Sequence, residues 1–192
     1  MAELVIPGIT DSNTLACISR ARTYVQYMLM VENALKDLCP FCKIDRTHNN
    51  IVAENKYWYA WPCNPPEANT KFHFLFVPKR HVTDSEQLRD VELIWLFGEA
   101  GIRRQVREKY GYTSRGTMMR DGDATLSAGT IQHLHVHDMV PNETGRVESP
   151  FYKGIEAEKE STRRAIVFEK LRTGSLIARL DAEEQALIRG RA

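Results

Sequence analysis

Histidine alternates three times with an apolar residue in the segment Gln132–His137, and no other pattern in the chain is as restrictive. Period-two alternation is typical of a β-strand, in which successive side chains point to opposite faces of a sheet. The pattern therefore predicts a strand over Thr130–His137, with the three imidazoles on one face and about 6.6 to 7 Å apart. Leu134 and Val136 are expected on the opposite face, in the core.

A row of imidazoles on one face has three interpretations. Partly exposed histidines without a joint role are disfavoured, because three of the six histidines in the chain fall on this one strand face. A metal site is the second interpretation, since His-x-His on a strand can present two nitrogens to Zn²⁺ at about 2.0 to 2.1 Å. The third is catalysis, in which one histidine attacks, a neighbour donates a proton or stabilises charge, and another fixes the tautomer.

Four further segments have the composition and the boundaries of β-strands: Ile51–Ala53, Tyr57–Trp61, Phe72–Val77 and Gly116–Arg120. The first two are expected to form a hairpin. The third is expected to be central, because its nearly continuous apolar run suits a strand buried on both faces. A loop of small and polar residues separates the fourth from the histidine strand.

Two long segments have helical periodicity. The first is amphipathic and extends from N-cap candidates in Asp11–Thr14 up to Cys39. The second, a long central helix, begins after Thr83 or Asp84 and ends at Gly111. Its apolar face is formed by Leu88, Val91, Trp95, Ile102 and Val106.

The C-terminal tail beyond Pro141 has mixed charge and is again helical, with a capping box at Asp181–Glu184. Together these elements predict an α+β fold. An antiparallel sheet of about five strands is expected to pack against the long central helix, with helical extensions at both ends of the chain.

Charge and hydropathy limit the partners of the chain. Its 192 residues include 26 Lys and Arg against 25 Asp and Glu, for a formal net charge of +1. This balance gives no global field that would favour nucleic acid or an anionic membrane. No apolar run approaches the roughly 18 residues of a membrane span and no signal-peptide pattern opens the chain, so a cytoplasmic protein with a locally bound anion is expected.

Four cysteines, Cys17, Cys39, Cys42 and Cys63, are too few for a disulfide scaffold. The Cys-x-x-Cys pair at Cys39 and Cys42 indicates metal or redox chemistry. Redox chemistry is disfavoured, because a helix precedes the pair and a loop follows it, unlike the strand-to-helix setting of a thioredoxin motif. Two inert thiols without a metal stay an alternative, and Cys17 and Cys63 are interpreted as ordinary residues.

Three motifs occur in the order found in the histidine-triad (HIT) family. The row of alternating histidines resembles the family signature, and His73–His81 resembles its His-x-Leu-x-x-Pro-Lys-x-His strand. Cys39–Ile44 resembles the Cys-x-Phe-Cys-Lys-Ile opening of many bacterial members. We therefore expect a HIT domain over 39–141, between helical extensions at 1–38 and 142–192.

The resemblance implies covalent catalysis at a nucleotide α-phosphate. His135 is the expected nucleophile, and water or another acceptor resolves its nucleotidyl-histidine intermediate. His137 is expected to contact phosphate oxygens and to assist the leaving group. His73 is expected to orient the row, although a hydrogen-bonded core histidine would have the same sequence context. Neutral imidazole is a good nucleophile near pH 7 when an acceptor holds the proton of its other nitrogen.

The same resemblance places Ser127, Gly129 and Thr130 in a loop that brings backbone N–H groups and a hydroxyl to the phosphate. Small residues let the backbone approach an anion closely, although an ordinary turn would have the same composition. Thr130 is a better side-chain candidate than Ser127.

The resemblance further implies a structural Zn²⁺ site of the Cys₂His₂ type, with Cys39, Cys42, His81 and His133 as ligands. Such distant ligands exclude a small zinc finger, whose histidines follow about 12 to 15 residues after the second cysteine. The ion would clamp the N-terminal segment to the sheet. No divalent cation is expected to be obligatory for the chemistry.

Two positions depart from the family pattern. Asp138 follows the triad where the family continues with apolar residues, and on simple alternation it points away from the histidines. Arg120-Asp121-Gly122 stands where many members have Asn-x-Gly, so the contacts of that Asn are not carried over.

The expected activity is hydrolysis or nucleotidyl transfer at an α-phosphate, with diadenosine polyphosphates and adenosine phosphoramidates as candidate substrates. The family implies a homodimer. Three alternatives stay open: phosphorolysis, in which inorganic phosphate replaces water; a metal-dependent hydrolase that uses the triad as zinc ligands; and a nucleotide-binding protein without catalysis.

Overall fold

A five-stranded antiparallel sheet forms the centre of the fold in the computed structural model, which describes residues 4–9, 15–47, 49–124, 126–127, 129–149, 151 and 154–174. The strands are β1 (Ala53–Glu54), β2 (Trp58–Pro62), β3 (Thr70–Pro78), β4 (Gly116–Arg120) and β5 (His135–Pro141). They lie in the order β1-β2-β3-β5-β4, so the long apolar strand β3 is central, as predicted. The α+β class and the predicted set of strands are confirmed.

The histidine strand begins later than its alternation predicts. β5 starts at His135, and the N–H group of Leu134 donates to the carbonyl of Val82 in a loop. β4 ends opposite His135, so the residues before it have no strand partner on that side. The prediction of a strand over 130–134 is therefore wrong, because alternation does not show where the neighbouring strands end.

The predicted central helix is present as two consecutive helices, α2 (Asp90–Phe97) and α3 (Ile102–Tyr110). Gly98 and Gly101 form the break between them. A Cβ atom at these positions would lie 2.5 Å and 2.6 Å from carbonyl oxygens of α2, so the tight turn requires both glycines. Gly111 ends α3 in the left-handed conformation, with φ of 68°, as predicted.

One face of the sheet packs against α2 and α3. Leu134 and Val136 are fully buried on this face, as the alternation predicts. The largest members of this core are Trp58, Phe74, Phe76, Leu96, Ile102 and Val106. Each such side chain contributes about 1.5 to 3 kcal/mol through its removal from water, so this layer fixes the position of β5.

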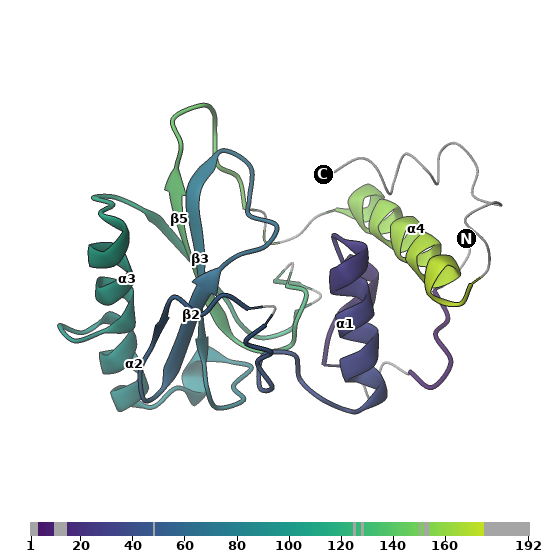
Figure 1. Cartoon of the computed structure of the whole chain (residues 1–192), viewed down its shortest axis with the longest axis horizontal. Helices are drawn as coiled ribbons and strands as arrows, with labels where there is room; N and C mark the ends of the chain where they lie inside the picture. The colour runs from purple at the N-terminus through teal and green to yellow at the C-terminus, as the bar shows by residue number, and fades with distance from the viewer. Residues whose placement is uncertain are drawn as a thin grey trace.

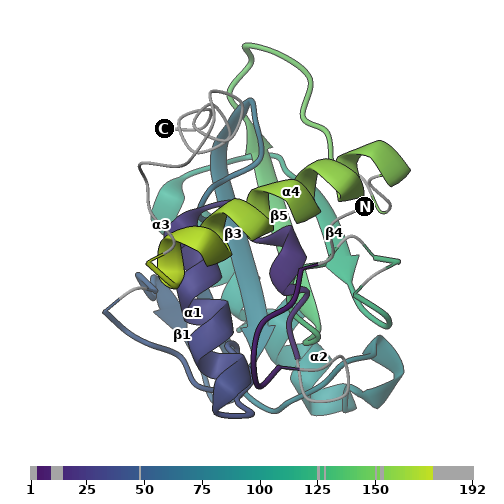
Figure 2. The same cartoon turned by 90° about the vertical axis from the view of Figure 1, so that its right-hand side faces the viewer.

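The opposite face of the sheet lies towards α1 (Tyr24–Leu35) and α4 (Ile155–Arg172), which pack against each other (Figures 1 and 2). Tyr27 of α1 is fully buried and donates a 2.7 Å hydrogen bond to Glu169 of α4. Phe168 packs against the same tyrosine. The two helices therefore form a second layer, built from both ends of the described chain.

The N-terminal helix is shorter than predicted. A short 3-10 helix, η1 (Ile18–Arg20), precedes α1, and the Thr23 hydroxyl caps α1 by accepting from the N–H group of Gln26. The expected caps at 11–14 and the capping box at 181–184 lie outside the described residues. Within the part that the structure describes, no helix combines the length and the apolar character needed to cross a membrane.

Candidate active site

A cavity of about 730 Å³ lies between the histidine face of the sheet and the pair of helices α1 and α4. His135 and His137 of β5 line it on the sheet side, and residues of both helices line the other side. Phe41 and Trp61 contribute apolar walls. This volume is within the range of about 300 to 1,000 Å³ that is typical of small-molecule sites.

His135 is held in one orientation and one tautomer. Its Nδ1 lies 2.7 Å from the backbone carbonyl oxygen of His133, so Nδ1–H donates and Nε2 keeps a lone pair. The ring is buried and lies edge-on to Phe41, with centroids 5.4 Å apart. Burial lowers the pKa of His135 to about 4, so the imidazole is neutral at pH 7. A neutral, oriented imidazole can act as a nucleophile through Nε2.

His73 and His137 form a chain of hydrogen bonds that fixes the second tautomer. The backbone N–H group of Glu67 donates to Nδ1 of His73 at 3.0 Å, so His73 carries its proton on Nε2. That Nε2 lies 2.8 Å from Nδ1 of His137, which must therefore accept. His137 is left with its proton on Nε2, and this buried atom has no hydrogen-bond partner among the residues that the structure describes.

The chain of hydrogen bonds therefore ends in an N–H donor beside His135. The rings of His135 and His137 are 4.9 Å apart, and both line the cavity. Burial lowers the pKa of His73 to about 4 and that of His137 well below its ordinary value. The site presents one nitrogen lone pair and one N–H group to the cavity.

The small-residue loop is only partly at the cavity. Gly129 and Thr130 line it, whereas Ser127 is not among the described residues that do so. The carbonyl of Ser127 instead accepts from the Arg120 guanidinium, and that of Gly129 accepts from Arg20 at 3.1 Å. The structure thus brings two of the three expected loop residues to the histidines.

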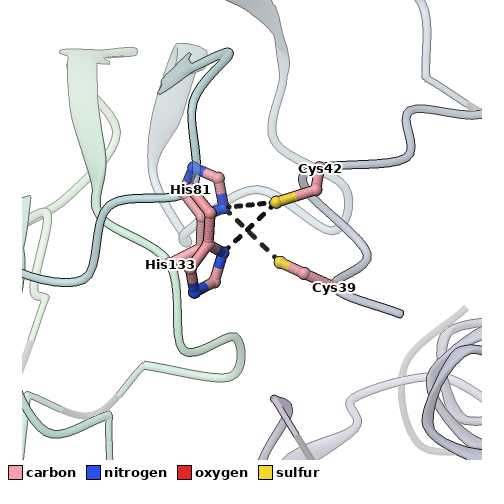
Figure 3. A group of neighbouring side chains, drawn as sticks. All are labelled: Cys39, Cys42, His81 and His133. Atoms are coloured by element: carbon pink, nitrogen blue, oxygen red, sulfur yellow. Dashed lines mark hydrogen bonds between the residues drawn. The ribbon is translucent and has the colours of Figure 1, made fainter. Parts of the chain in front are cut away.

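The four expected metal ligands converge at the edge of the sheet (Figure 3). Cys42 Sγ lies 3.2 Å from His81 Nδ1 and 3.6 Å from His133 Nδ1, and Cys39 Sγ lies 3.4 Å from His133 Nδ1. Tetrahedral Zn²⁺ with ordinary bond lengths would separate its ligand atoms by roughly 3.3 to 3.8 Å, so the spacing fits this ion.

Electrostatics at this cluster also suit a cation. Burial and the neighbouring Cys39 raise the pKa of Cys42 to about 12, and a divalent cation would offset the charge of two thiolates. His133 lies 3.1 Å from the Pro78 carbonyl through Nε2, so its Nδ1 is unprotonated and available as a ligand. These four residues can therefore hold a metal ion.

The triad histidines do not converge on one metal position. Of the groups of described residues that could hold an ion, one contains His133 and another contains Cys63, His73 and His137, and neither contains His135. In the second group the nitrogens of His73 are already engaged by Glu67 and His137. The geometry therefore gives no support to a hydrolase that uses the triad as zinc ligands.

Asp138 points away from the histidines, as predicted, and is fully buried. Its carboxylate pairs with Arg103 at 2.7 Å and with Arg115 at 3.1 Å, and accepts from the Thr117 hydroxyl at 2.9 Å. This residue holds α3 to β4 and β5 and does not line the cavity.

Three arginines line the cavity, Arg22, Arg120 and Arg164, and none of them was singled out as a site residue by the sequence motifs. Arg120 ends β4 and Arg22 lies just before α1, and both line the cavity with the histidines. The register of β4 and β5 places Arg120 opposite His135. This register depends on how β4 pairs with β5. No single sequence motif contains both strands, so the motifs could not place Arg120 opposite His135.

No family model matches the chain, and no curated protein matches it. Among solved structures, a HIT family member from Bacillus subtilis is 20% identical, with a TM-score of 0.45, and the match covers 75% of this chain and 98% of that one. A histidine-triad nucleotide-binding protein from Candida albicans is 18% identical, with a TM-score of 0.45, over 71% of this chain and 96% of that one.

A zinc-bound histidine-triad family protein from Mycobacterium smegmatis is 22% identical, with a TM-score of 0.43, over 72% of this chain and 97% of that one. All three are described as histidine-triad proteins, the family whose motifs this sequence resembles. At these identities and TM-scores the likenesses carry no conclusion about activity, and the site is interpreted from its own contacts.

Proposed function

We propose that this chain is a HIT-type nucleotide hydrolase or nucleotidyltransferase in which His135 Nε2 attacks an α-phosphate. The observation that carries the proposal is the fixed tautomer of His135, whose Nδ1–H is held by the His133 carbonyl at 2.7 Å. Only Nε2 then has a lone pair, on a ring that lines a cavity large enough for a nucleotide.

The reaction has two steps. In the first, a bond forms between His135 Nε2 and the α-phosphorus while the bond from phosphorus to the leaving group breaks. Neutral His137 donates a hydrogen bond from Nε2–H to the leaving atom and keeps its proton, and the leaving atom takes any proton that it needs from water. In the second, water attacks the phosphorus and releases one proton to the solvent, the N–P bond breaks with its electron pair returning to His135 Nε2, and the nucleoside monophosphate departs. Another acceptor in place of water would make the enzyme a transferase.

The remaining residues of the site position the phosphate and the rings. Gly129 and Thr130 line the same cavity as His135, and we propose that they bind phosphate oxygens through the backbone and the Thr130 hydroxyl. Ser127 has no such support. His73 acts through its hydrogen bond to His137 and so keeps the proton of His137 on Nε2.

Cys39, Cys42, His81 and His133 are proposed to hold a structural Zn²⁺ ion, which would tie the N-terminal segment to the start of β5. The ion has no part in the two steps above. The chelator dependence of folding and of activity separates this structural role from a catalytic one.

We further propose a HIT domain at 39–141 with extensions at 1–38 and 142–192, and a homodimer. All five strands and the helices α2 and α3 lie within 39–141, and this supports the proposed bounds of the HIT domain. Both extensions border the cavity through α1 and α4, so they are proposed to complete the binding site. Sedimentation analysis would test the dimer.

Intact-protein mass spectrometry tests the covalent step. The zinc-loaded protein is mixed briefly with an adenosine phosphoramidate or a diadenosine polyphosphate, quenched without acid, and compared with His135→Ala. We expect the mass of one adenylyl group on the wild type and none on the variant, with or without chelator during the reaction. Turnover that proceeds without an adduct and that stops when chelator is added would contradict the mechanism.

Nucleotide binding without catalysis is tested in the same samples. A protein that binds AMP in the cavity, forms no adduct and releases no product would be a binding protein. Equal AMP affinity in the wild type and in His135→Ala, with no turnover in either, is the result that would establish this alternative.

A further inference from the structure

The segment before α1 pairs with the loop that leads into β5. The Cys17 N–H group donates to the Thr130 carbonyl at 2.7 Å. The Gln132 N–H group donates to the Leu15 carbonyl, also at 2.7 Å. These are the two bonds of an isolated antiparallel bridge. The N-terminal segment therefore supports the loop through its backbone.

Arg20, at the end of η1, holds the same loop through its buried side chain. Its Nη1 donates to the Ala124 carbonyl at 2.6 Å and to the Gly129 carbonyl at 3.1 Å. The loop folds back so that these two residues are in contact, since a Cβ atom at Gly129 would lie 3.4 Å from that of Ala124. One guanidinium nitrogen therefore joins two separate points of the loop.

Glu158 of α4 holds the other side of this guanidinium. Its carboxylate accepts from Arg20 Nε at 3.0 Å and lies 2.9 Å from Nη2. The two side chains are 6% and 26% exposed, and a planar pair of this kind leaves the guanidinium little freedom to turn. Arg164 of α4 also donates to the Ala21 carbonyl at 3.1 Å, just after η1. Helix α4 therefore sets the direction in which Arg20 presents Nη1 to the loop.

The contacts of Arg20 determine where the N–H group of Thr130 points. In a trans peptide the C=O and N–H groups point in opposite directions, so a Gly129 carbonyl bound to Arg20 directs the Thr130 N–H group away from Arg20. Gly129 and Thr130 line the cavity, whereas Arg20 is not among the described residues that do so. Among the residues that the structure describes, none accepts from the Thr130 N–H group. This donor is therefore available to a ligand in the cavity.

Both peptide groups of Thr130 are held by the N-terminal segment. Arg20 binds the carbonyl before this residue, and the Cys17 N–H group binds the carbonyl after it. A loop that contains glycine has wide conformational freedom without such contacts. A displacement of about 1 Å in a group that positions a substrate can cost about 100-fold in rate. The orientation of this one N–H group can therefore matter for the chemistry.

We infer that Arg20, anchored by Glu158, is a positioning residue that orients the Thr130 N–H group towards an oxygen of the phosphate that His135 attacks. This inference rests on the proposed function and goes beyond it, because both members of the pair lie outside 39–141. Arg20 acts through the loop and does not itself line the cavity. The two terminal extensions thus act together on one loop between β4 and β5.

The rate and the extent of adduct formation test this role separately. Single-turnover mass spectrometry at saturating adenosine phosphoramidate follows the adenylylation of His135 in the wild type, Arg20→Gln, Arg20→Lys and Glu158→Gln. Tyr27→Phe removes the 2.7 Å hydrogen bond from α1 to Glu169 of α4 and is the control for a loosened helix pair. A defect in folding lowers the fraction of chains that form the adduct, whereas a misdirected loop lowers the rate constant.

Arg20→Gln is expected to lower the rate constant by about 10- to 100-fold while nearly every chain still forms the adduct. Arg20→Lys should recover part of the loss, because lysine keeps the charge but lacks the planar fork. Glu158→Gln should lie between the wild type and Arg20→Gln. The double variant should be no slower than Arg20→Gln, because Glu158 acts through Arg20. Tyr27→Phe should stay within about twofold of the wild type.

Two results would overturn the inference. One is a smaller adduct-forming fraction with an unchanged rate constant in the Arg20 and Glu158 variants, which would assign the pair to the fold alone. The other is a loss in Tyr27→Phe that equals the loss in Arg20→Gln. If Arg20→Gln does not fold, the rate constants of Arg20→Lys and Glu158→Gln decide the test in the same way.

Hydrogen exchange locates the effect in the chain. Peptides that cover 122–132 should exchange at least about tenfold faster in Arg20→Gln than in the wild type, and peptides of β3 should exchange equally in both. Tyr27→Phe should leave the exchange of 122–132 unchanged. Equal protection of 122–132 in Arg20→Gln and the wild type would overturn the inference.

Calorimetry with AMP separates this inference from the proposed function, because AMP carries the phosphate but undergoes no turnover. If the wild type forms no adduct but binds AMP at least about tenfold more tightly than Arg20→Gln does, the proposed function fails and the positioning of a bound phosphate stands. If the wild type forms the adduct and Arg20→Gln forms it at the same rate, the inference fails and the proposed function stands. Neither an adduct nor AMP binding in the wild type would overturn both.

Discussion

His133 and the pair His135 and His137 belong to one short segment, yet they lie in different chemical environments. His133 faces two cysteine sulfurs at the sheet edge and bonds a backbone carbonyl through its other nitrogen. His135 and His137 line a cavity, and His135 presents a fixed lone pair and His137 a fixed N–H group. The sequence spacing of the three is the same, so spacing does not decide their roles.

The end of β4 explains the difference. β5 begins at His135, where β4 ends, and His133 therefore lies in the loop before the strand. A loop residue can turn towards Cys39 and Cys42, whereas the strand residues are held on the face below α1 and α4. The backbone carbonyl of His133 connects the two environments, because it accepts the hydrogen bond from the Nδ1–H group of His135.

Substitution of His135 gives the largest expected effect and separates the two environments. His135→Ala should lower kcat by about 10⁴-fold or more, because it removes the nucleophile. The metal content and the thermal stability of the variant should stay close to those of the wild type. Single-turnover assays and metal analysis measure both, and a parallel loss of metal would show that the two environments are not independent.

Removal of the metal should act on stability first. Free Zn²⁺ at about 1,000 times its dissociation constant would stabilise the folded state by about 4 kcal/mol, and a chelator removes this contribution. Cys42→Ser should be destabilised by a similar amount and should no longer respond to chelator. Urea unfolding with and without chelator measures the change. Wild-type stability that does not depend on chelator or Zn²⁺ would contradict the structural metal site.

Much of the sheet could be predicted from local patterns. The apolar run of β3 predicts a central strand, and the alternation around Leu134 and Val136 predicts the buried face, because both depend on neighbouring residues in the chain. The break between α2 and α3 had a local signal in Gly98 and Gly101. Helical periodicity continues across this break, so periodicity alone predicts one helix.

The site was predictable only as far as its motifs extend. The convergence of Cys39, Cys42, His81 and His133 agrees with the resemblance, because each ligand lies in a recognisable motif. Arg120 was seen only as a departure from the family pattern, because its place beside His135 depends on strand register. The partners of Asp138 and the position of Arg22 depend on tertiary contacts in the same way.

His73 tests how far the fixed tautomer of His137 matters. His73→Phe removes the donor to His137 Nδ1 and should lower kcat by about 10- to 100-fold, since the proton of His137 is no longer confined to Nε2. His73→Gln can restore an N–H donor and should recover part of the loss. Equal defects in both variants would indicate a packing role for this side chain, and unchanged kcat in both would contradict the hydrogen-bond chain.

Acid titration gives the smallest expected effect and isolates one proton. Burial lowers the pKa of folded His73 to about 4, from an ordinary value near 6.5. The unfolded chain therefore binds a proton at this site before the folded chain does, so stability is fully present above about pH 6.5 and is lost as the pH falls towards 4. His73 should contribute a slope of about 1.4 kcal/mol per pH unit in this window.

Urea unfolding of the wild type and of His73→Phe between pH 4 and 6.5 measures this slope. The variant should be less sensitive to pH by about one proton, because phenylalanine does not titrate, while the burial of His137 keeps its own share of the pH dependence. Equal slopes in the two proteins would mean that water reaches His73 in the folded state. His73 would then be open to solvent like Cys42 and His81 of the metal cluster, and the contrast between the two environments would fail.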